Sequence, residues 1–193
     1  MDAITDVVPF VPFQKIGRLS RLCTITEKID GTNACIYIGE SGEFLAGSRS
    51  RWITPVDDNY GFAKWAHAHR DELMVLGPGT HYGEWWGHGI QRNYSQTEKR
   101  FSLFNTFRWR DDAEIPRPAC CSLVPVLYEG QIEEYGVLKG MKAALNGLQT
   151  EGSAAAPGFM KPEGIVIYHH ATKQYFKKTL EKDEKPKGSN EES

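Results

Sequence analysis

Two runs of strand-forming residues near the start of the chain, separated by a short glycine-containing break, constrain its fold more than any other feature. Residues 22–29 and 34–38 are rich in β-formers, and Gly31-Thr32-Asn33 lies between them. Such a break favours a sharp change of direction between two strands. Lys28 stands at the end of the first run, where a rigid strand can hold its amine facing a cleft. The local sequence therefore predicts two strands with a lysine at their junction.

The rest of the chain continues this strand-rich pattern and adds two helical segments. Apolar residues recur at helical spacing after a polar cluster at residues 57–59, and again over residues 132–148. The apolar stripe of the second helix would consist of Ile132, Tyr135, Leu138 and Leu145. Further strands are expected at residues 43–46, 80–86, 101–109, 122–129, 163–169 and 173–178. The pattern predicts an α+β fold of antiparallel sheets with a few flanking helices.

Length and composition predict one folded domain followed by a charged tail. The chain has 193 residues, of which 40% are hydrophobic, enough for one core. We expect residues 1–180 to form the domain and residues 181–193 to be disordered. The segment 149–158, rich in Gly, Ser and Ala, is expected to be a mobile loop. No apolar stretch reaches the roughly 18 residues of a membrane span, and no secretory signal is evident, so we expect a cytoplasmic protein.

The overall charge gives no support for a polyanionic partner. The formal net charge is -2 and the sequence pI is about 6.3, whereas dedicated nucleic-acid binders often exceed a pI of about 9. The four cysteines include the adjacent pair Cys120 and Cys121, a poor spacing for two ligands of one zinc ion. Any nucleic-acid site must therefore depend on local patches and on the chemistry of individual side chains.

Lys28 is the first candidate for such chemistry. It belongs to the segment Glu27-Lys28-Ile29-Asp30-Gly31-Thr32-Asn33. A lysine amine is a nucleophile only in its neutral form, which desolvation or nearby cations favour. The alternative is a solvated lysine in front of an Asp-Gly hairpin turn. This heptapeptide alone leaves both interpretations open.

The segment also resembles a known motif. Lys28-Ile29-Asp30-Gly31-Thr32-Asn33 is similar to the K-x-D-G-T-N motif of the covalent nucleotidyltransferase superfamily, which includes DNA ligases, RNA ligases and mRNA capping enzymes. The later motifs of that superfamily have counterparts here in the same order. These counterparts are Ser48-Arg49-Ser50-Arg51, Tyr82-Gly83-Glu84-Trp85-Trp86, Leu103-Phe104-Asn105, Glu163-Gly164-Ile165-Val166 and Phe176-Lys177-Lys178. The resemblance spans residues 27–178 and implies the ATP-grasp-like nucleotidyltransferase domain of ligases.

The resemblance implies a role for each matched residue. Lys28 would carry AMP covalently, and Glu84 would hold the ribose. Phe104 would stack on the purine, while Glu163 would lie near the metal and the phosphate. The expected nucleotide contacts are completed by Glu27, Asn33 and Arg49. ATP would be the AMP donor, with Mg²⁺ or Mn²⁺ as the metal, since magnesium prefers oxygen ligands.

The last motif departs from the common pattern. Many relatives have K-x-K, whereas Lys177 and Lys178 are adjacent here and Thr179 follows. Cations must surround an α-phosphate under attack, so both lysines are candidate catalytic residues. Which of them faces the phosphate is left open by the sequence.

Among the branches of the superfamily, the chain looks most like small RNA ligases. Few residues follow Lys178, so no OB-fold domain is expected. The resemblance implies an enzyme that joins 5′-phosphate and 3′-hydroxyl ends of RNA through lysyl-AMP and an adenylylated 5′ end. A compact DNA ligase that seals nicks, or an AMP-transferring module acting with a partner protein, are the alternatives. The expected contacts to nucleic acid are Arg49, Arg51, Arg92, Lys99 and Arg100.

Overall fold

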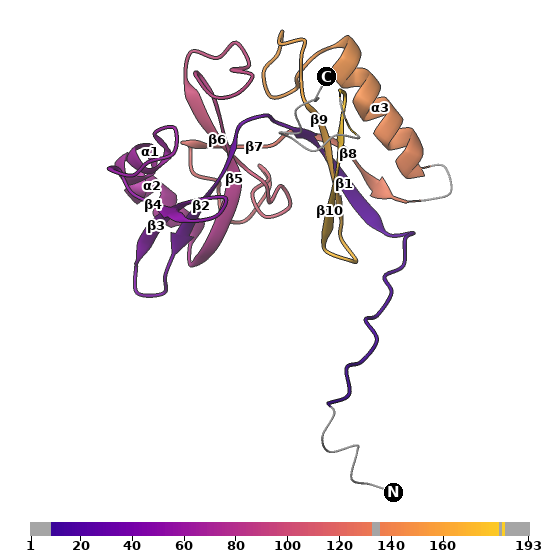
Figure 1. Cartoon of the computed structure of the whole chain (residues 1–193), viewed down its shortest axis with the longest axis horizontal. Coiled ribbons are helices and arrows are strands. Elements are labelled where there is room, and N and C mark those ends of the chain that lie inside the picture. The colour runs from indigo at the N-terminus through magenta and orange to yellow at the C-terminus, as the bar shows by residue number, and fades with distance from the viewer. Residues whose placement is uncertain (1–8, 133–135, 182, 184–193) are drawn as a thin grey trace, which may run out of the picture.

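The computed structural model describes residues 9–132, 136–181 and 183, and arranges them around two β-sheets (Figure 1). The large sheet has the strand order β4-β3-β2-β5-β6-β7 and the small sheet the order β10-β9-β1-β8. The large sheet comprises β2 (Thr32–Ile38), β3 (Phe44–Ser48), β4 (Trp52–Ile53), β5 (Gly79–Gly87), β6 (Lys99–Leu103) and β7 (Cys121–Leu123). The small sheet comprises β1 (Leu22–Lys28), β8 (Val126–Gln131), β9 (Gly164–His169) and β10 (Gln174–Thr179).

The predicted fold class is confirmed. Every pair of neighbouring strands is antiparallel except β6 and β7, which are parallel. The helices are α1 (Phe62–Ala68), α2 (Arg70–Leu73), a 3₁₀ turn η1 (Met74–Leu76) and α3 (Gly136–Thr150). Asp58 from the predicted polar cluster accepts hydrogen bonds from the backbone N–H groups of Ala63 and Lys64, in the first turn of α1. None of the helices within the described residues is long and apolar enough to span a membrane.

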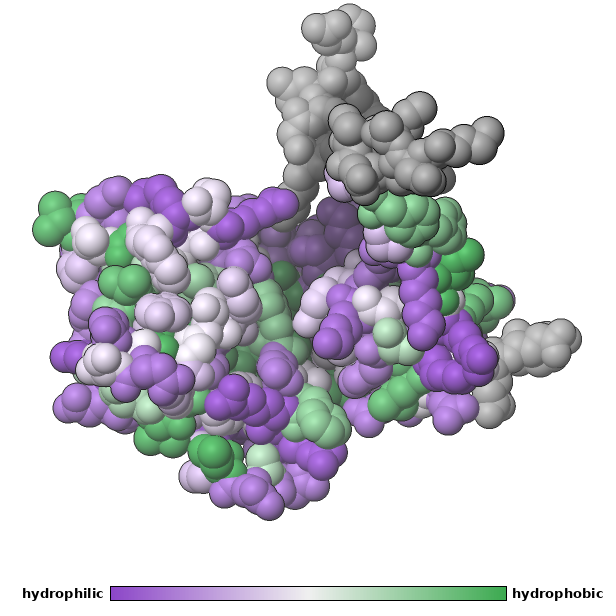
Figure 2. Space-filling view, turned by 90° about the horizontal axis from the view of Figure 1, so that it is seen from below, coloured by the Kyte–Doolittle hydropathy of each residue, from purple (hydrophilic) through white to green (hydrophobic). Residues whose placement is uncertain are grey.

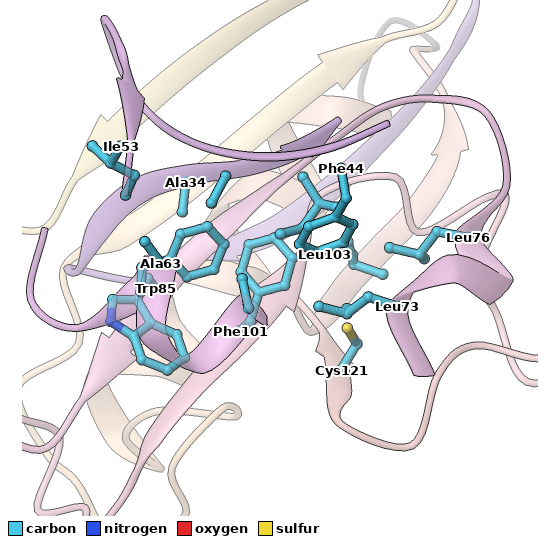
Figure 3. Packing of buried hydrophobic residues seen from close by; sticks show 14 of the residues in the cluster. Ala34, Phe44, Ile53, Ala63, Leu73, Leu76, Trp85, Phe101, Leu103 and Cys121 are labelled. Carbon is cyan, nitrogen blue, oxygen red and sulfur yellow. The ribbon is translucent and has the colours of Figure 1, made fainter. Parts of the chain in front are cut away.

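Each sheet has its own hydrophobic core. In the large sheet, Trp85, Phe101 and Leu103 pack against side chains from α1, α2 and η1, as Figure 3 shows. In the small sheet, Ile25 and Ile165 pack against Leu148 of α3. The predicted second helix therefore exists but begins at Gly136, and the Tyr135 of its expected stripe lies outside the described residues. Residues 182 and 184–193 of the expected tail also lie outside them.

Two short segments cross from one sheet to the other, and a cleft lies between the two sheets. The first crossing, residues 29–31, follows Lys28 and leads straight into β2. The second is at Val124 and Pro125, where the predicted strand 122–129 divides into β7 and β8 in different sheets. Proline has no N–H to contribute to a ladder, which explains the division. The carbonyl of Pro125 instead accepts a hydrogen bond of 2.9 Å from the Glu27 backbone N–H.

Two other segments differ from their sequence-based predictions. The strand predicted for residues 101–109 ends at Leu103, because Asn105 accepts a hydrogen bond of 3.0 Å from the Arg108 backbone N–H and turns the chain. The segment 149–158, predicted to be mobile, begins as the last turn of α3. It is then held by Ser153, whose hydroxyl donates to the buried Glu27 carboxylate at 2.6 Å. That contact is long-range, so local composition gave no sign of it.

Candidate active site

A cleft of about 600 Å³ runs between the two sheets, and the space-filling view from below shows the hollow between the two halves of the molecule (Figure 2). The small sheet contributes cleft-facing residues of β1, β9 and β10. The large sheet contributes β2, β5 and the loop after β6. Lining residues that matter for the argument are Lys28, Asn33, Glu84, Phe104, Val166 and Tyr175. The structure thus brings together residues that lie far apart in the sequence.

Lys28, which lines this cleft, is in direct contact with Glu163. The Lys28 Nζ atom donates a hydrogen bond of 2.6 Å to Glu163 Oε2. The side chains are 22% and 5% exposed, so the amine is reachable while the carboxylate is almost buried. Lys28 pairs with Gly164 across β1 and β9. A Cβ atom at Gly164 would lie 2.2 Å from the Lys178 carbonyl oxygen, so glycine is required for β9 and β10 to approach so closely.

Glu84 faces the same space from the large sheet. It lies opposite Asn33 in the β2–β5 pairing, and both line the cleft. Its Oε1 accepts a hydrogen bond of 3.0 Å from the backbone N–H of Gly31 in the first crossing. Burial raises the pKa of the Glu84 carboxyl to about 7, although Lys28 and the Gly31 N–H both lower it. Glu84 is therefore a partly desolvated oxygen acceptor facing the cleft.

Apolar side chains from both sheets also line the cleft. Phe104, at the end of β6, packs against the junction cluster that contains Ile29 and Val124. Val166 of β9 lines the cleft from the small sheet. We had not predicted a role for Val166 itself. The sequence does indicate the direction of the Val166 side chain, because strand alternation places Val166 on the same face as Tyr168, two residues further along.

The Glu27 side chain lies on the face of β1 opposite to that of Lys28. Its carboxylate accepts hydrogen bonds from the Ser153 hydroxyl at 2.6 Å and from the Ala155 backbone N–H at 2.9 Å. Burial raises the pKa of the Glu27 carboxyl, and these hydrogen bonds oppose the shift. The expected polar contact to a nucleotide would therefore have to come from the Glu27 backbone, because its side chain anchors the segment after α3.

The two adjacent lysines of the last motif face opposite sides of the small sheet. Lys177 lies opposite Val166, whereas Lys178 lies opposite Ile165, a core residue beneath α3. Because directly opposed residues share a face, Lys177 is on the cleft side and Lys178 on the other. The Lys178 Nζ atom pairs with Asp183 at 3.0 Å. The strand geometry thus distinguishes two lysines that the sequence left equivalent.

Arg92 connects the two sides of the Lys28–Glu163 pair. Its Nε donates to Asp30 at 3.0 Å, and its Nη1 donates to the Lys161 carbonyl at 2.9 Å. Asp30 follows Lys28 by two residues, and Lys161 precedes Glu163 by two. Arg92 was predicted to contact nucleic acid, but its Nε and Nη1 atoms donate within the protein.

The loop that carries Arg92 has an unusual backbone. Asn93, Tyr94 and Ser95 all have positive φ angles, of 61°, 50° and 53°. Non-glycine residues adopt this conformation only where surrounding contacts compensate for its cost. The Tyr94 side chain is fully buried and its hydroxyl accepts a hydrogen bond of 2.9 Å from the Asp30 backbone N–H. Two contacts from this loop thus hold the turn after the lysine.

The other expected nucleic-acid contacts lie outside the cleft. Arg51 makes a two-pronged ion pair with Asp57, and the Lys99 amine donates to the Tyr60 carbonyl. The Arg100 guanidinium lies 5.9 Å from the centre of the Trp86 ring. Arg49 is exposed immediately after β3. These side chains are not among those that line the cleft.

A family model described as RNA ligase matches residues 21–180. Solved structures of Naegleria gruberi RNA ligase variants with AMP and Mn and with ATP and Mn are similar, with TM-scores of 0.59 and 0.57 and identities of 16% and 18%. A Naegleria gruberi RNA ligase structure with PPi has a TM-score of 0.56 at 18% identity. No curated protein matches the chain.

The likeness to these solved structures shows a shared fold. Each of the three matches covers 83% of this chain but 50% of that chain, so the chain spans about half the length of the structures it resembles. The family match is more extensive, because residues 21–180 contain the whole two-sheet body from β1 to β10. On that match, the chain belongs to the RNA ligase family.

Proposed function

We propose that this chain is an ATP-dependent RNA ligase that carries AMP covalently on Lys28 and joins 5′-phosphate to 3′-hydroxyl ends. The observation that carries the proposal is the Lys28 amine, which lies 2.6 Å from Glu163 and lines the same cleft as the half-buried Glu84. Family membership supports the reaction class. Solved relatives with AMP, ATP and Mn support a nucleotide as the cleft ligand.

In the first step the neutral Lys28 amine attacks the α-phosphorus of ATP. A nitrogen–phosphorus bond forms, the bond to the β-phosphate oxygen breaks, and pyrophosphate leaves. The proton that the amine sheds is released to water, which leaves the Glu163 carboxylate available to the metal. The adenine stacks on Phe104, which excludes water, with Val166 lining the cleft from the small sheet, and Glu84 accepts hydrogen bonds from the ribose hydroxyls.

Two displacements complete the reaction. An oxygen of the RNA 5′-phosphate attacks the phosphorus of lysyl-AMP, which breaks the nitrogen–phosphorus bond and returns the amine to Lys28. The 3′-hydroxyl of the second RNA end then attacks the 5′-phosphate and releases AMP. Each displacement needs in-line geometry and positive charge around the phosphate. Lys177, on the cleft face of β10 opposite Val166, would supply such a charge.

A divalent metal fits this site only together with substrate phosphates. Within the described residues no group of three or more His, Cys, Asp and Glu side chains could hold a metal. Magnesium is often held by one or two carboxylates plus phosphates and water, and Glu163 and Glu84 both present oxygens at the cleft. Glu163 is the ligand we propose, and the metal would neutralise charge that develops on the phosphate.

The proposed substrate is tested with nicked duplexes that differ only in the sugars beside the nick. The protein is incubated with ATP and Mg²⁺ at low salt, because phosphate contacts weaken steeply as salt rises. We expect the nick with ribose at the 3′-hydroxyl side to be sealed faster, since the 2′-hydroxyl distinguishes RNA from DNA. Equal or faster sealing of the all-DNA nick would favour a DNA ligase. Adenylation without sealing of either nick would favour an AMP-transferring module.

A further inference from the structure

An N-terminal arm precedes the two-sheet body. Residues 9–20 leave the start of β1 as an extended trace that points away from the sheets (Figure 1). The arm is attached at its base, where the Leu19 carbonyl accepts a hydrogen bond of 3.0 Å from His169 Nε2. Further out, Phe10 and Phe13 are 88% and 87% exposed. The arm also precedes the range matched by the RNA ligase family model, which starts at residue 21.

The arm has a three-residue repeat. Its large apolar residues at this spacing are Phe10, Phe13, Ile16 and Leu19, and its basic residues are Lys15, Arg18 and Arg21. Proline-containing extended chains have about three residues per turn, and the arm contains Pro9 and Pro12. Residues at this spacing therefore form one apolar edge and one basic edge along the same segment.

The charge of the arm differs from that of the whole chain. No Asp or Glu occurs from residue 9 to residue 26, although the net charge of the chain is -2. Within the described residues, no hydrogen bond or ion pair is made by the side chains of Lys15 and Arg18. By contrast, Arg51 and Arg92 are paired with Asp57 and Asp30. The arginines Arg51 and Arg92 of the two-sheet body are thus neutralised by carboxylates, whereas Lys15 and Arg18 of the arm have no such partner among the described residues.

We propose that residues 9–20 form a binding site for single-stranded RNA that leads to the ends to be joined. Phe10 and Phe13 would stack on unpaired bases, which aromatic side chains do without sequence preference. Lys15 and Arg18 would contact phosphates on the neighbouring edge. An extended arm of twelve residues reaches about 37 Å at roughly 3.1 Å per residue, far enough to follow a strand that enters the cleft. This inference rests on the proposed function.

Two double variants of the full chain separate the two edges of the arm. Lys15→Gln with Arg18→Gln removes the basic edge, and Phe10→Ala with Phe13→Ala removes the aromatic one. Binding of a fluorescent, 5′-phosphorylated single-stranded RNA is measured by anisotropy over a series of salt concentrations. Lys139→Gln with Lys142→Gln on α3 is the matched control, because both lysines are exposed and three residues apart.

Loss of the basic edge and loss of the aromatic edge should change RNA binding in different ways. Loss of two phosphate contacts should reduce the slope of log affinity against log salt by about 1.4, at about 0.7 per contact. Loss of two stacking contacts, at about 5-fold or more each, should weaken binding about 30-fold or more with little change of slope. The α3 variant should match wild type in both affinity and slope. AMP labelling from ATP alone, measured on every variant, reports that the body is folded and active.

Two results would overturn the proposal. One is RNA affinity and salt slope equal to wild type in both arm variants, with AMP labelling intact. The other is loss of self-association in the aromatic variant, measured by sedimentation, with RNA binding unchanged, because the arm would then dock on a second copy of the chain. Either result would be compatible with the proposed ligase reaction. A wild-type protein that takes up no AMP would contradict the proposed function itself.

Discussion

Arg92 and Asp30 form an ion pair with a separation of 3.0 Å between Nε and Oδ2, and the same guanidinium binds the Lys161 carbonyl at 2.9 Å. Asp30 lies on the turn two residues after Lys28, and Lys161 lies two residues before Glu163. One side chain from the β5–β6 loop thus links the two segments that carry the lysine and its carboxylate partner. Its geometry is that of a positioning residue for the Lys28–Glu163 pair.

Replacement of Arg92 by methionine should slow the transfer of AMP to Lys28 even without RNA. The change keeps the length of the side chain but removes its donors, which frees the turn at Asp30 from the segment before Glu163. Misplacement by about 1 Å can cost about 100-fold in rate, so we expect a loss of roughly 10- to 100-fold. The rate is measured as single-turnover labelling by ATP, with the affinity for ATP determined in parallel.

Arg100→Met is the control for Arg92→Met, because Arg100 lies on β6 over the Trp86 ring and outside the cleft lining. We expect its labelling rate to be close to that of wild type. If Arg92→Met labels normally with ATP but binds RNA poorly, the original sequence-based role of Arg92 as a nucleic-acid contact would be the correct one.

Glu84 should make stability depend on pH near neutrality. Burial raises the pKa of this carboxyl to about 7 in the folded protein, from a value of 4.5 for the unperturbed group. Between these values the folded protein holds a proton that the unfolded chain has released, so low pH favours folding. The stabilising contribution is complete below the unfolded value and is lost as pH rises through about 7.

A neutral replacement isolates this effect. Glu84→Gln cannot ionise, so its melting temperature should rise relative to that of wild type between about pH 5.5 and about pH 8. Thermal unfolding of both proteins across this range gives the comparison. A difference in melting temperature that stays constant with pH would show that Glu84 does not titrate near neutrality.

The two adjacent lysines should differ in their effect on catalysis. Lys177→Ala removes a cation on the cleft face, and removal of one group that stabilises charge at a reacting centre can cost about 100- to 1,000-fold. Lys178→Ala removes a pairing with Asp183 on the other face, so AMP transfer should be little affected. Both variants are compared by their rate of labelling with ATP and Mg²⁺. The reverse ranking would mean that the register of β10 does not determine which lysine meets the phosphate.

The fold class could be predicted because it depends on local pattern. Runs of β-formers identified most strands, and helical spacing identified the two helical regions. The errors arise where a local run crosses from one sheet to the other. Residues 122–129 look like one strand, but Pro125 divides them, and which sheet receives each half depends on long-range pairing of β7 with β6 and of β8 with β1.

The candidate site was predicted in its residue types but not in its geometry. Motif order identified Lys28, Glu84 and Glu163 as candidates, and in the structure Lys28 contacts Glu163 and lines the same cleft as Glu84. The direction of the Glu27 side chain could not be predicted, because it depends on a contact with Ser153, 126 residues away. The same holds for Arg92, whose partners become apparent only when the β5–β6 loop is folded against Asp30.

The covalent step is the central claim, and intact-mass spectrometry tests it most directly. The protein is incubated with ATP and Mg²⁺ and its mass is compared with that of Lys28→Arg treated in the same way. Arginine keeps a positive charge beside Glu163, so the variant retains the ion pair but lacks the amine nucleophile. We predict the addition of one AMP to wild type, located on Lys28 by peptide mapping, and no addition to the variant. AMP on the variant, or on another residue of the wild type, would contradict the account.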